Sequence, residues 1–321
     1  MSICSARKLE SWVKIVDLFC GCGGLSLGLE SAGFEVQWAC DNWDKAVAVY
    51  KSNFDHPVTQ MDVSDVAKVV SHISEFQIDG IVGGPPCQDF SSAGKRHEGG
   101  RADLTSSFAE IVEAVRPRFF IMENVARARA SQAYASASQR LRQSGYGLTE
   151  VVLNASLCGV PQRRKRFFSI GILGASDQAI APYFVKNMAK EELTVREYLK
   201  SEASFDHYYR HPRNYSRRAI YSIDEPAATI RGVNRPVPAG YPGHSADAAP
   251  LHPRIRSLST QERSRIQTFP SNFNWGAAKT HLELMIGNAV PVELGRFVGR
   301  CVLEGIGELY GTREERIRLY A

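Results

Sequence analysis

Short apolar segments alternate with amphipathic segments through the first half of the chain. The apolar segments have the length of buried strands, and the segments between them carry apolar residues at helical spacing. The expected strands are residues 13–19, 36–40, 78–82 and 119–122, and the expected helices are residues 25–32, 46–53, 63–73 and 106–115. Such βαβ alternation predicts an α/β fold with a doubly wound, Rossmann-like and mostly parallel sheet.

The pattern changes in the second half. Further strands are expected at 151–154 and 167–172, but residues 175–281 break into short pieces separated by prolines. So much irregular backbone predicts a second, smaller and loop-rich domain. Apolar periodicity returns at 290–306, which predicts a helix that packs back on the first domain.

Composition limits the class of protein. A chain of 321 residues with 44% hydrophobic content can bury one large core and a second domain. It contains no run of 18 apolar residues and no secretory signal, so neither a membrane span nor export is expected. Its seven cysteines follow no disulfide framework and favour a reducing compartment. One residue between Cys20 and Cys22 is too few for a zinc pair, so no metal is expected.

The positive charge is concentrated in two segments. The formal net charge is only +5, but residues 207–218 contain four arginines, three tyrosines and no acid. Residues 253–265 add four arginines against one glutamate. Arginines interleaved with aromatic residues suit phosphate contact and base stacking, although a solvated basic face is the alternative.

A cysteine follows the apolar segment 78–82 in the sequence Gly-Gly-Pro-Pro-Cys-Gln, in which the cysteine is Cys87. Two prolines cannot continue a central strand, so the chain must turn there. Glu123 follows the next expected strand, and the carboxyl ends of parallel strands share one edge of a sheet. Cys87 alone would be interpreted as a small buried hydrophobe. Its pairing with Glu123 favours a catalytic thiol and acid.

A glycine-rich turn, residues 17–25, follows the first strand and leads into a helix, the usual site of a nucleoside-bearing cofactor. Ser26 replaces the third glycine of the dinucleotide fingerprint, which disfavours a nicotinamide cofactor. The second strand ends near Asp41 and Trp43, a carboxylate for ribose hydroxyls and an indole for adenine. The next strand along the chain is expected to carry Met61-Asp62-Val63. The carboxylate of Asp62 could accept a hydrogen bond from the exocyclic amine of the adenine. Together these residues predict a nucleoside pocket.

Six spaced blocks of sequence closely resemble the cytosine-C5 DNA methyltransferases, the S-adenosyl-L-methionine-dependent enzymes of bacterial restriction–modification systems. The blocks are Asp17-Leu18-Phe19-x-Gly21-x-Gly23-Gly24, Pro85-Pro86-Cys87-Gln88, Glu123-Asn124-Val125, Gln162-Arg163-Arg164-Lys165-Arg166, Arg263 with Gln267 and Phe269-Pro270, and Gly287-Asn288-Ala289-Val290-Pro291. The resemblance covers nearly the whole chain in order. It implies a catalytic, cofactor-binding domain of residues 1–174 and 282–321 and a target-recognition domain of residues 175–281.

The resemblance also implies a mechanism. Cys87 would add to C6 of a cytosine flipped out of duplex DNA, and C5 would then accept a methyl group from S-adenosyl-L-methionine. Glu123 would protonate N3 and Arg166 would face O2, with Arg164 supporting the geometry. The base that removes the C5 proton is left unassigned.

Binding residues follow from the same resemblance. Those expected at the cofactor are Phe19, Gly21, Gly23, Gly24, Leu25, Asp41, Asn42, Trp43, Asp62, Val63, Pro85, Leu104, Asn288 and Ala289, and those at DNA are Gln88, Ser91, Arg163, Thr229 and Arg231. Many family members have a glutamate where this chain has Asn42. Either Asp41 takes over the ribose contact or Asn42 makes a neutral one.

The expected partner is double-stranded DNA, bound by a monomer at the nucleoid in the cytoplasm, and a cognate restriction endonuclease is left open. Three alternatives compete with this interpretation. A tRNA cytosine methyltransferase of the same fold usually carries a Cys-Phe-Thr element in the variable region, which this chain lacks. A specificity subunit without turnover would not need Cys87, Glu123 and Arg166. A Rossmann dehydrogenase is disfavoured by Ser26 and by the lack of a histidine near the strand ends.

Overall fold

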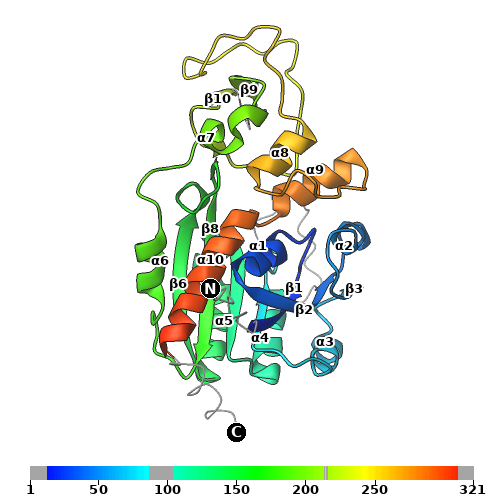
Figure 1. Ribbon diagram of the computed structural model, residues 1–321, viewed down its shortest axis with the longest axis vertical. Coiled ribbons are helices and arrows are strands. Elements are labelled where there is room, and N and C mark those ends of the chain that lie inside the picture. Colours follow the sequence, from blue (N-terminus) through cyan, green and yellow to red (C-terminus); the bar gives the residue numbers. More distant parts are fainter. Residues whose placement is uncertain (1–12, 87–103, 213, 215, 310–321) are drawn as a thin grey trace, which may run out of the picture.

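A seven-stranded sheet forms the centre of the molecule in the computed structural model, which describes residues 13–86, 104–212, 214 and 216–309. The strand order is β3-β2-β1-β4-β5-β8-β6, and β8 alone among these runs in the direction opposite to the other strands. The strands are β1 (Val13–Leu18), β2 (Phe34–Asp41), β3 (Val58–Gln60), β4 (Gly80–Gly83), β5 (Phe119–Val125), β6 (Tyr146–Asn154) and β8 (Lys165–Leu173). The predicted mostly parallel sheet is confirmed (Figure 1).

Helices cover both faces of this sheet, because successive strand residues point to opposite sides and both sides are apolar. Ile15 belongs to a buried cluster under α1 (Gly24–Ala32), α6 (Ala181–Asn187) and α10 (Val292–Leu309). Its neighbour Val16 belongs to a second cluster under α3 (Val66–Ile73), α4 (Leu104–Val115) and α5 (Gln132–Gln143). Figure 1 shows α1 and α10 in front of the sheet and α4 and α5 behind it. The fold is therefore doubly wound, as predicted.

The predicted returning helix is α10, which packs along α1. The approach is close: a Cβ atom on Gly24 would lie 2.2 Å from the carbonyl oxygen of Val290. This contact places the residues before α10 beside the glycine-rich turn after β1. The site described below depends on that juxtaposition of two distant parts of the chain.

Three details differ from the sequence prediction. Strand β5 continues to Val125 because it pairs with β8 as far as Arg166, so Glu123 lies inside a strand and not beyond its end. Strand β3 ends at Gln60, so Asp62 and Val63 follow the strand that was expected to carry them. The expected helix from residue 63 begins only at Val66, because the Asp65 side chain caps it by accepting from the amide of Lys68.

Residues 175–281 contain only short elements, and apart from α6, which packs against the sheet, these lie together at one end of it (Figure 1). They include α7 (Val195–Leu199), α8 (Thr260–Ile266) and the pair β9 (His207–Tyr209) and β10 (Ile220–Ser222). Helix α2 (Asp44–Lys51) and helix α9 (Lys279–Asn288) lie nearer the sheet. The small pair β7 (Gln162–Arg163) and β11 (Ala227–Ala228) joins the two regions. The division into two domains stays a prediction.

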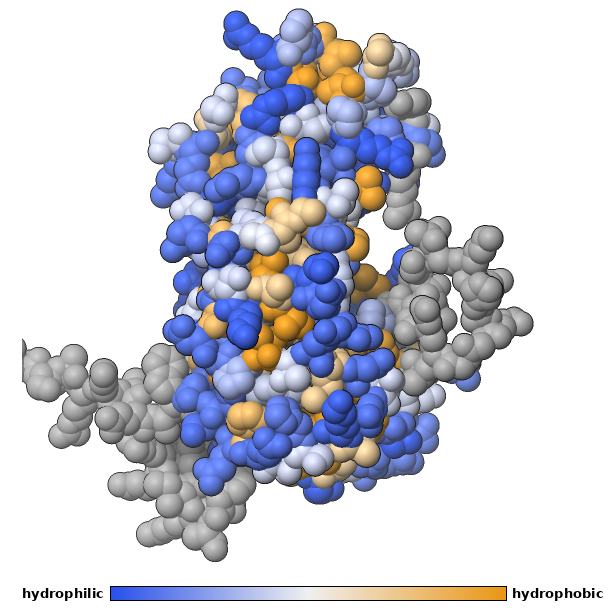
Figure 2. All heavy atoms as spheres, turned by 90° about the vertical axis from the view of Figure 1, so that its right-hand side faces the viewer, coloured by the Kyte–Doolittle hydropathy of each residue, from blue (hydrophilic) through white to orange (hydrophobic). Residues whose placement is uncertain are grey.

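The surface of the molecule is mostly polar, as expected for a fold whose apolar residues are buried between the helices and the sheet. Figure 2 shows hydrophilic side chains over most of one face, with hydrophobic side chains gathered near its middle. None of the helices in the described ranges combines the length and the apolarity needed to cross a membrane.

Candidate active site

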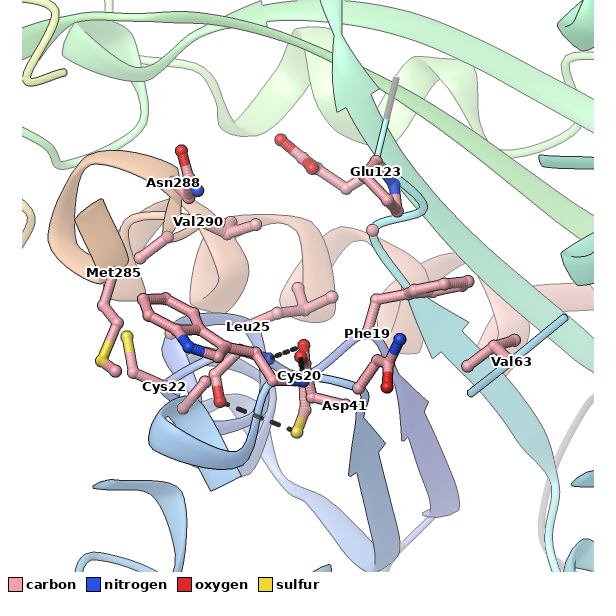
Figure 3. A pocket seen from close by; sticks show the side chains of 18 of the residues that line it. Phe19, Cys20, Cys22, Leu25, Asp41, Val63, Glu123, Met285, Asn288 and Val290 are labelled. Atoms are coloured by element: carbon pink, nitrogen blue, oxygen red, sulfur yellow. Dashed lines mark hydrogen bonds between the residues drawn. The ribbon is translucent and has the colours of Figure 1, made fainter. Parts of the chain in front are cut away.

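A cavity of about 340 Å³ lies at the carboxyl ends of strands β1, β2, β4 and β5. Strand β1 has β2 on one side and β4 on the other, so the chain order reverses here, and ligands of open α/β sheets bind at such a point. The lining residues are Phe19, Cys20, Gly21, Cys22, Gly24, Leu25, Asp41, Asn42, Trp43, Ala46, Asp62, Val63, Gly84, Pro86, Leu104, Glu123, Met285, Asn288, Ala289 and Val290. Figure 3 shows most of their side chains directed toward one space.

Asp41 braces the glycine-rich turn. Its Oδ2 accepts from the amide of Gly21 at 2.9 Å, and its Oδ1 accepts from the amide of Trp43 at 2.8 Å. Burial raises the pKa of Asp41, and the two backbone hydrogen bonds lower it. Both oxygens are thus engaged with the protein's own backbone, while the neighbouring Asn42 side chain is exposed at the cavity.

Glu123 forms the acidic part of the cavity wall. Figure 3 shows its carboxyl group pointing from β5 toward the side of the cavity where Asn288 lies. Its Oε1 is 2.8 Å from Nε of Arg166, and both side chains are largely buried. Burial raises the pKa of Glu123, and the guanidinium groups of Arg166 and Arg164 lower it. The protonated form of this carboxyl group is therefore favoured relative to an exposed glutamate.

Arg164 is almost completely buried, with 1% of its surface exposed. It donates to the carbonyl oxygens of Ile230 at 2.9 Å, Gly287 at 2.9 Å and Ala289 at 3.1 Å. Burial lowers the pKa of this guanidinium group. Arg164 thus connects strand β8, which it precedes, with two backbone segments that are distant in sequence, at Ile230 and at residues 287–289.

Most of the predicted cofactor residues come together in this cavity. All of them line it except Gly23, which lies in the turn against Phe54, and Pro85, which is buried. The Pro85 carbonyl accepts from Asn124 at 3.0 Å. Cys87, Gln88 and Ser91 lie outside the described residues, but Pro86, which directly precedes Cys87, lines the cavity.

Sequence reasoning missed several lining residues, namely Cys20, Cys22, Ala46, Gly84, Pro86, Met285 and Val290. Cys20 and Cys22 alternate with the glycines of the turn, so that spacing was a usable signal. Burial raises the pKa of the Cys22 thiol to about 12, which keeps it neutral. Met285 gave no signal, because only the packing of α9 brings it to the cavity. Among the residues that the structure describes, no group of three or more potential metal ligands occurs.

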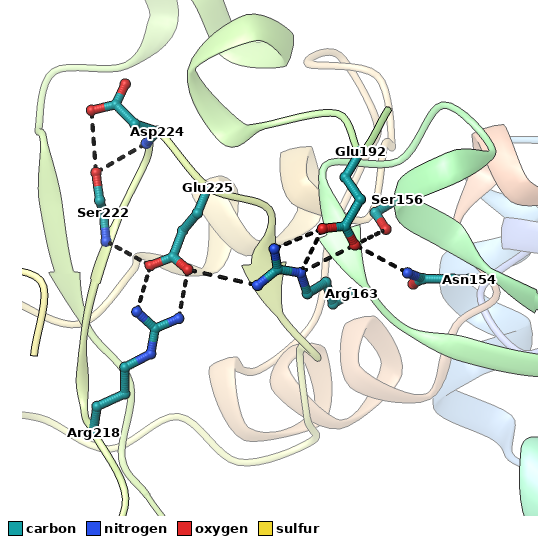
Figure 4. Close-up of polar contacts among 8 residues, drawn as sticks. All are labelled: Asn154, Ser156, Arg163, Glu192, Arg218, Ser222, Asp224 and Glu225. Carbon is teal, nitrogen blue, oxygen red and sulfur yellow. Dashed lines mark hydrogen bonds and ion pairs between the residues drawn. The ribbon is translucent and has the colours of Figure 1, made fainter. Parts of the chain in front are cut away.

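Arg163, predicted to contact DNA, is engaged within the protein (Figure 4). Its Nη2 is 2.6 Å from Oε2 of Glu192 and its Nη1 is 3.8 Å from Glu225. Hydrogen bonding to Arg163 lowers the pKa of Glu192 to about 2. Glu225 also accepts from Arg218 at 2.8 Å. The Thr229 hydroxyl group, another predicted DNA contact, donates to the Arg163 carbonyl at 2.8 Å.

The arginine-rich segments are less free than their sequence suggests. Several of these arginines pair with carboxylates or carbonyls, and most of the carboxylates come from outside the two segments. The pairs are Arg210 with the Thr229 carbonyl, Arg218 with Glu225, Arg256 with Glu262, Arg263 with Glu283, and Arg265 with Glu202. Arg231, a predicted DNA contact, donates to the His211 carbonyl. The DNA contact of these clusters stays a prediction, and on DNA these arginines would have to share or exchange the partners named here.

Known proteins with similar sequences point in one direction. Residues 13–304 match the family of C-5 cytosine-specific DNA methylases. The chain is 50% identical over 293 residues to the Type II methyltransferase M.HindV of Haemophilus influenzae, covering 91% of this chain and 96% of that protein. It is 52% identical over 287 residues to the Type II methyltransferase M.HgiDI of Herpetosiphon aurantiacus, covering 89% and 93%. The crystal structure of the S. pombe Dnmt2 methyltransferase, 18% identical, superimposes with a TM-score of 0.67 over 92% of this chain and 99% of that one, which shows a shared fold.

Proposed function

The chain belongs to the family of C-5 cytosine-specific DNA methylases, and from this premise we propose how it performs that reaction. The methyl group comes from S-adenosyl-L-methionine and goes to C5 of a cytosine flipped out of a specific duplex sequence. Cys87 forms a transient covalent bond to C6 of that cytosine. The observation that carries the proposal is one cavity whose wall includes both Glu123 and Pro86, the residue before Cys87.

The cavity suits a donor that combines an aromatic base, a ribose and a charged chain. Trp43, Phe19 and Val63 offer apolar and aromatic surface for the adenine, and the exposed Asp62 offers an acceptor for its amine. Because the oxygens of Asp41 are bound to backbone amides, we assign the neutral ribose contact to Asn42.

The other wall residues complete the donor site. Gly21 and Gly23 precede α1, Gly24 and Leu25 begin it, and this turn adds backbone amides. Leu104, Asn288 and Ala289 line other sides of the cavity, and Pro85 is buried next to Pro86 at its wall. When bound, S-adenosyl-L-methionine supplies an electrophilic methyl group.

The protein groups make cytosine reactive toward that methyl group. C5 of cytosine is a poor nucleophile, and addition of the Cys87 thiolate to C6 converts the ring to an enamine. Glu123 delivers a proton to N3 as the C6–S bond forms, and burial favours the protonated acid that this step needs. Arg166, held against Glu123, stabilises charge at O2, and Arg164 fixes the surrounding backbone. Loss of the C5 proton then releases the Cys87 thiolate.

The target base must leave the duplex, since C6 is inaccessible inside stacked DNA. We assign residues 175–281 to the part of the protein that closes on the DNA opposite the catalytic cavity, and apart from α6 they lie at one end of the sheet. Thr229 and Arg231 lie on that side, Arg163 joins it to the sheet, and Gln88 and Ser91 follow the catalytic thiol in sequence. The Type II names of its relatives support a place beside a cognate restriction endonuclease, with the chain acting on duplex DNA as a monomer.

Covalent trapping tests this mechanism directly. In DNA made with 5-fluorocytosine, fluorine at C5 cannot leave as a proton does, so the Cys87 adduct should persist after methyl transfer. We expect a protein–DNA complex that survives denaturing electrophoresis and forms only with S-adenosyl-L-methionine.

Two serine substitutions provide the matched comparison. Cys87→Ser should form no complex while still shifting DNA in a native gel, and Cys158→Ser, at a buried thiol that does not line the cavity, should form it normally. Methyl transfer without any trapped complex would contradict the covalent route.

A further inference from the structure

A chain of buried amide hydrogen bonds connects the donor cavity with the backbone beside the proposed DNA contacts. The amide of Ile230 donates to Oε1 of Gln162 at 2.8 Å, and Nε2 of Gln162 donates to Oε1 of Gln267 at 2.7 Å. Nε2 of Gln267 then donates to the carbonyl oxygens of Ile286 and, at 3.2 Å, of Ala289. Both glutamine side chains are completely buried. Each bond fixes the orientation of the next amide, so the chain has one consistent direction.

The two ends of this chain belong to different binding surfaces. Ile230 lies between Thr229 and Arg231, which we assign to DNA contact. Ala289 lines the donor cavity beside Asn288. Arg164 bridges the same ends, because it donates to the carbonyls of both Ile230 and Ala289.

The two backbone segments also touch directly. A Cβ atom on Gly287 would lie 2.2 Å from the amide nitrogen of Gly232 and 2.4 Å from the carbonyl carbon of Arg231. Residues 229–232 and 289–291 lie outside the helices and strands, although the Ala289 amide still donates to the Met285 carbonyl of α9 at 2.9 Å. The side chains of Gln162, Gln267 and Arg164 add hydrogen bonds that connect the two segments.

We propose that Gln162 and Gln267 are positioning residues that make donor binding and DNA binding cooperative. Ordering residues 229–231 by DNA fixes the amide of Ile230, and the two glutamines pass that constraint to the backbone at Ala289. The second ligand then meets a segment that is already ordered, so its own binding loses less conformational entropy. This inference rests on the proposed function, because it takes the two surfaces to be the donor site and the DNA site.

The test compares donor affinity with and without DNA. S-adenosyl-L-homocysteine, which cannot react, is titrated by calorimetry into the protein alone and into its complex with a duplex carrying the methylated site found by bisulfite sequencing. DNA should raise the affinity of the wild-type protein by about fivefold or more. In Gln162→Met and Gln267→Met, which keep the side-chain length but lose the amide, the ratio should fall toward one. Gln261→Met, at an exposed position on helix α8, which ends directly before Gln267, is the matched control and should keep the wild-type ratio.

The outcomes separate this inference from the proposed function. If the wild-type protein binds both ligands without any coupling, or if the variants keep the wild-type ratio, the positioning role is wrong and the proposed reaction still stands. If the wild-type protein does not bind S-adenosyl-L-homocysteine at all, the proposed donor is wrong.

Hydrogen exchange on the wild-type protein provides a test that does not depend on the variants folding. S-adenosyl-L-homocysteine alone should slow exchange at the Ile230 amide, and DNA alone should slow exchange of the Ala289 and Val290 amides. Unchanged exchange in both experiments would overturn the proposal.

Discussion

Charged side chains have different functions at the carboxyl ends of the sheet strands and in the region 175–281. At the carboxyl ends of the strands, Glu123 lines the cavity, where a ligand can reach it, and it forms a largely buried pair with Arg166. In residues 175–281, pairs such as Arg218 with Glu225 and Arg265 with Glu202 connect segments of the protein to one another. The role of a charged residue therefore depends on the groups that lie next to it in the folded protein. The number of charges along the sequence does not give those neighbours.

The largest effect on methylation is expected from removing the carboxyl group of Glu123. Glu123→Gln keeps the shape but cannot deliver a proton to N3, so the methylation rate should fall by about 100-fold or more. DNA affinity in a gel shift should change little. Glu113→Gln, at an exposed carboxylate that pairs with Arg140 on the surface, is the control and should remain active. Comparable activity in both variants would contradict the role of Glu123.

The next effect concerns Asp17, a carboxyl group buried beneath the glycine-rich turn. Burial raises its pKa from 3.8 to about 7, so the folded protein binds a proton that the unfolded chain has released between about pH 4 and pH 7. Stability from this group is therefore greatest at the acidic end of that window and falls as pH rises through it, by roughly 4 kcal/mol at most.

Asp17→Asn should remove this dependence. Urea unfolding near pH 5 and near pH 8 should show the variant gaining stability relative to the wild-type protein at the higher pH. Asp55→Asn, at an exposed position, should show no such change. An equal difference at both pH values would mean that Asp17 ionises normally in the folded protein.

A smaller effect is expected from the brace under the donor cavity. Asp41→Ala leaves the amides of Gly21 and Trp43 without their acceptor, which should weaken binding of S-adenosyl-L-homocysteine by about tenfold. Calorimetry of the variant beside Asp44→Ala, whose exposed carboxylate pairs with Lys45, measures this difference. Equal affinities would show that the turn holds its shape without Asp41.

The smallest effect sharpens the distinction among the arginines. Arg217 and Arg254 are exposed and have no ion pair in the part of the chain that the structure describes, so they are available to phosphates. The logarithm of the DNA-binding constant falls linearly with the logarithm of the salt concentration, and each substitution to alanine should reduce the magnitude of that slope by about one. Arg256→Ala and Arg265→Ala, which remove arginines already paired with Glu262 and Glu202, should leave the slope near the wild-type value. The reverse pattern would show that the ion pairs open on DNA.

Much of the sheet could be predicted, because its signals are local. The alternation of apolar and amphipathic segments placed β1, β2, β4 and β5 and the helices between them to within a few residues. Because parallel strands align their carboxyl ends, the same pattern indicated that the glycine-rich turn, Asp41 and Glu123 would meet at one edge. The predicted cofactor residues near these strand ends, Phe19, Gly21, Asp41 and Trp43, line one cavity for this reason.

What could not be predicted depends on contacts between distant segments. Asp41 could have faced a ribose, and only its distances to the Gly21 and Trp43 amides show where its oxygens are engaged. Residues 253–265 contain four arginines and one glutamate, yet Glu202 and Glu283 reach them from other parts of the chain. Periodicity and local charge contain no information about such partners.

Bisulfite sequencing of DNA from cells that express the chain detects the methylated product itself, because C5-methylated cytosine resists conversion. We expect protected cytosines at one recurring sequence with the wild-type chain, and none beyond background with Cys87→Ser. Full conversion with the wild-type chain would show that it does not methylate C5, and equal protection by the variant would show that Cys87 is not the nucleophile.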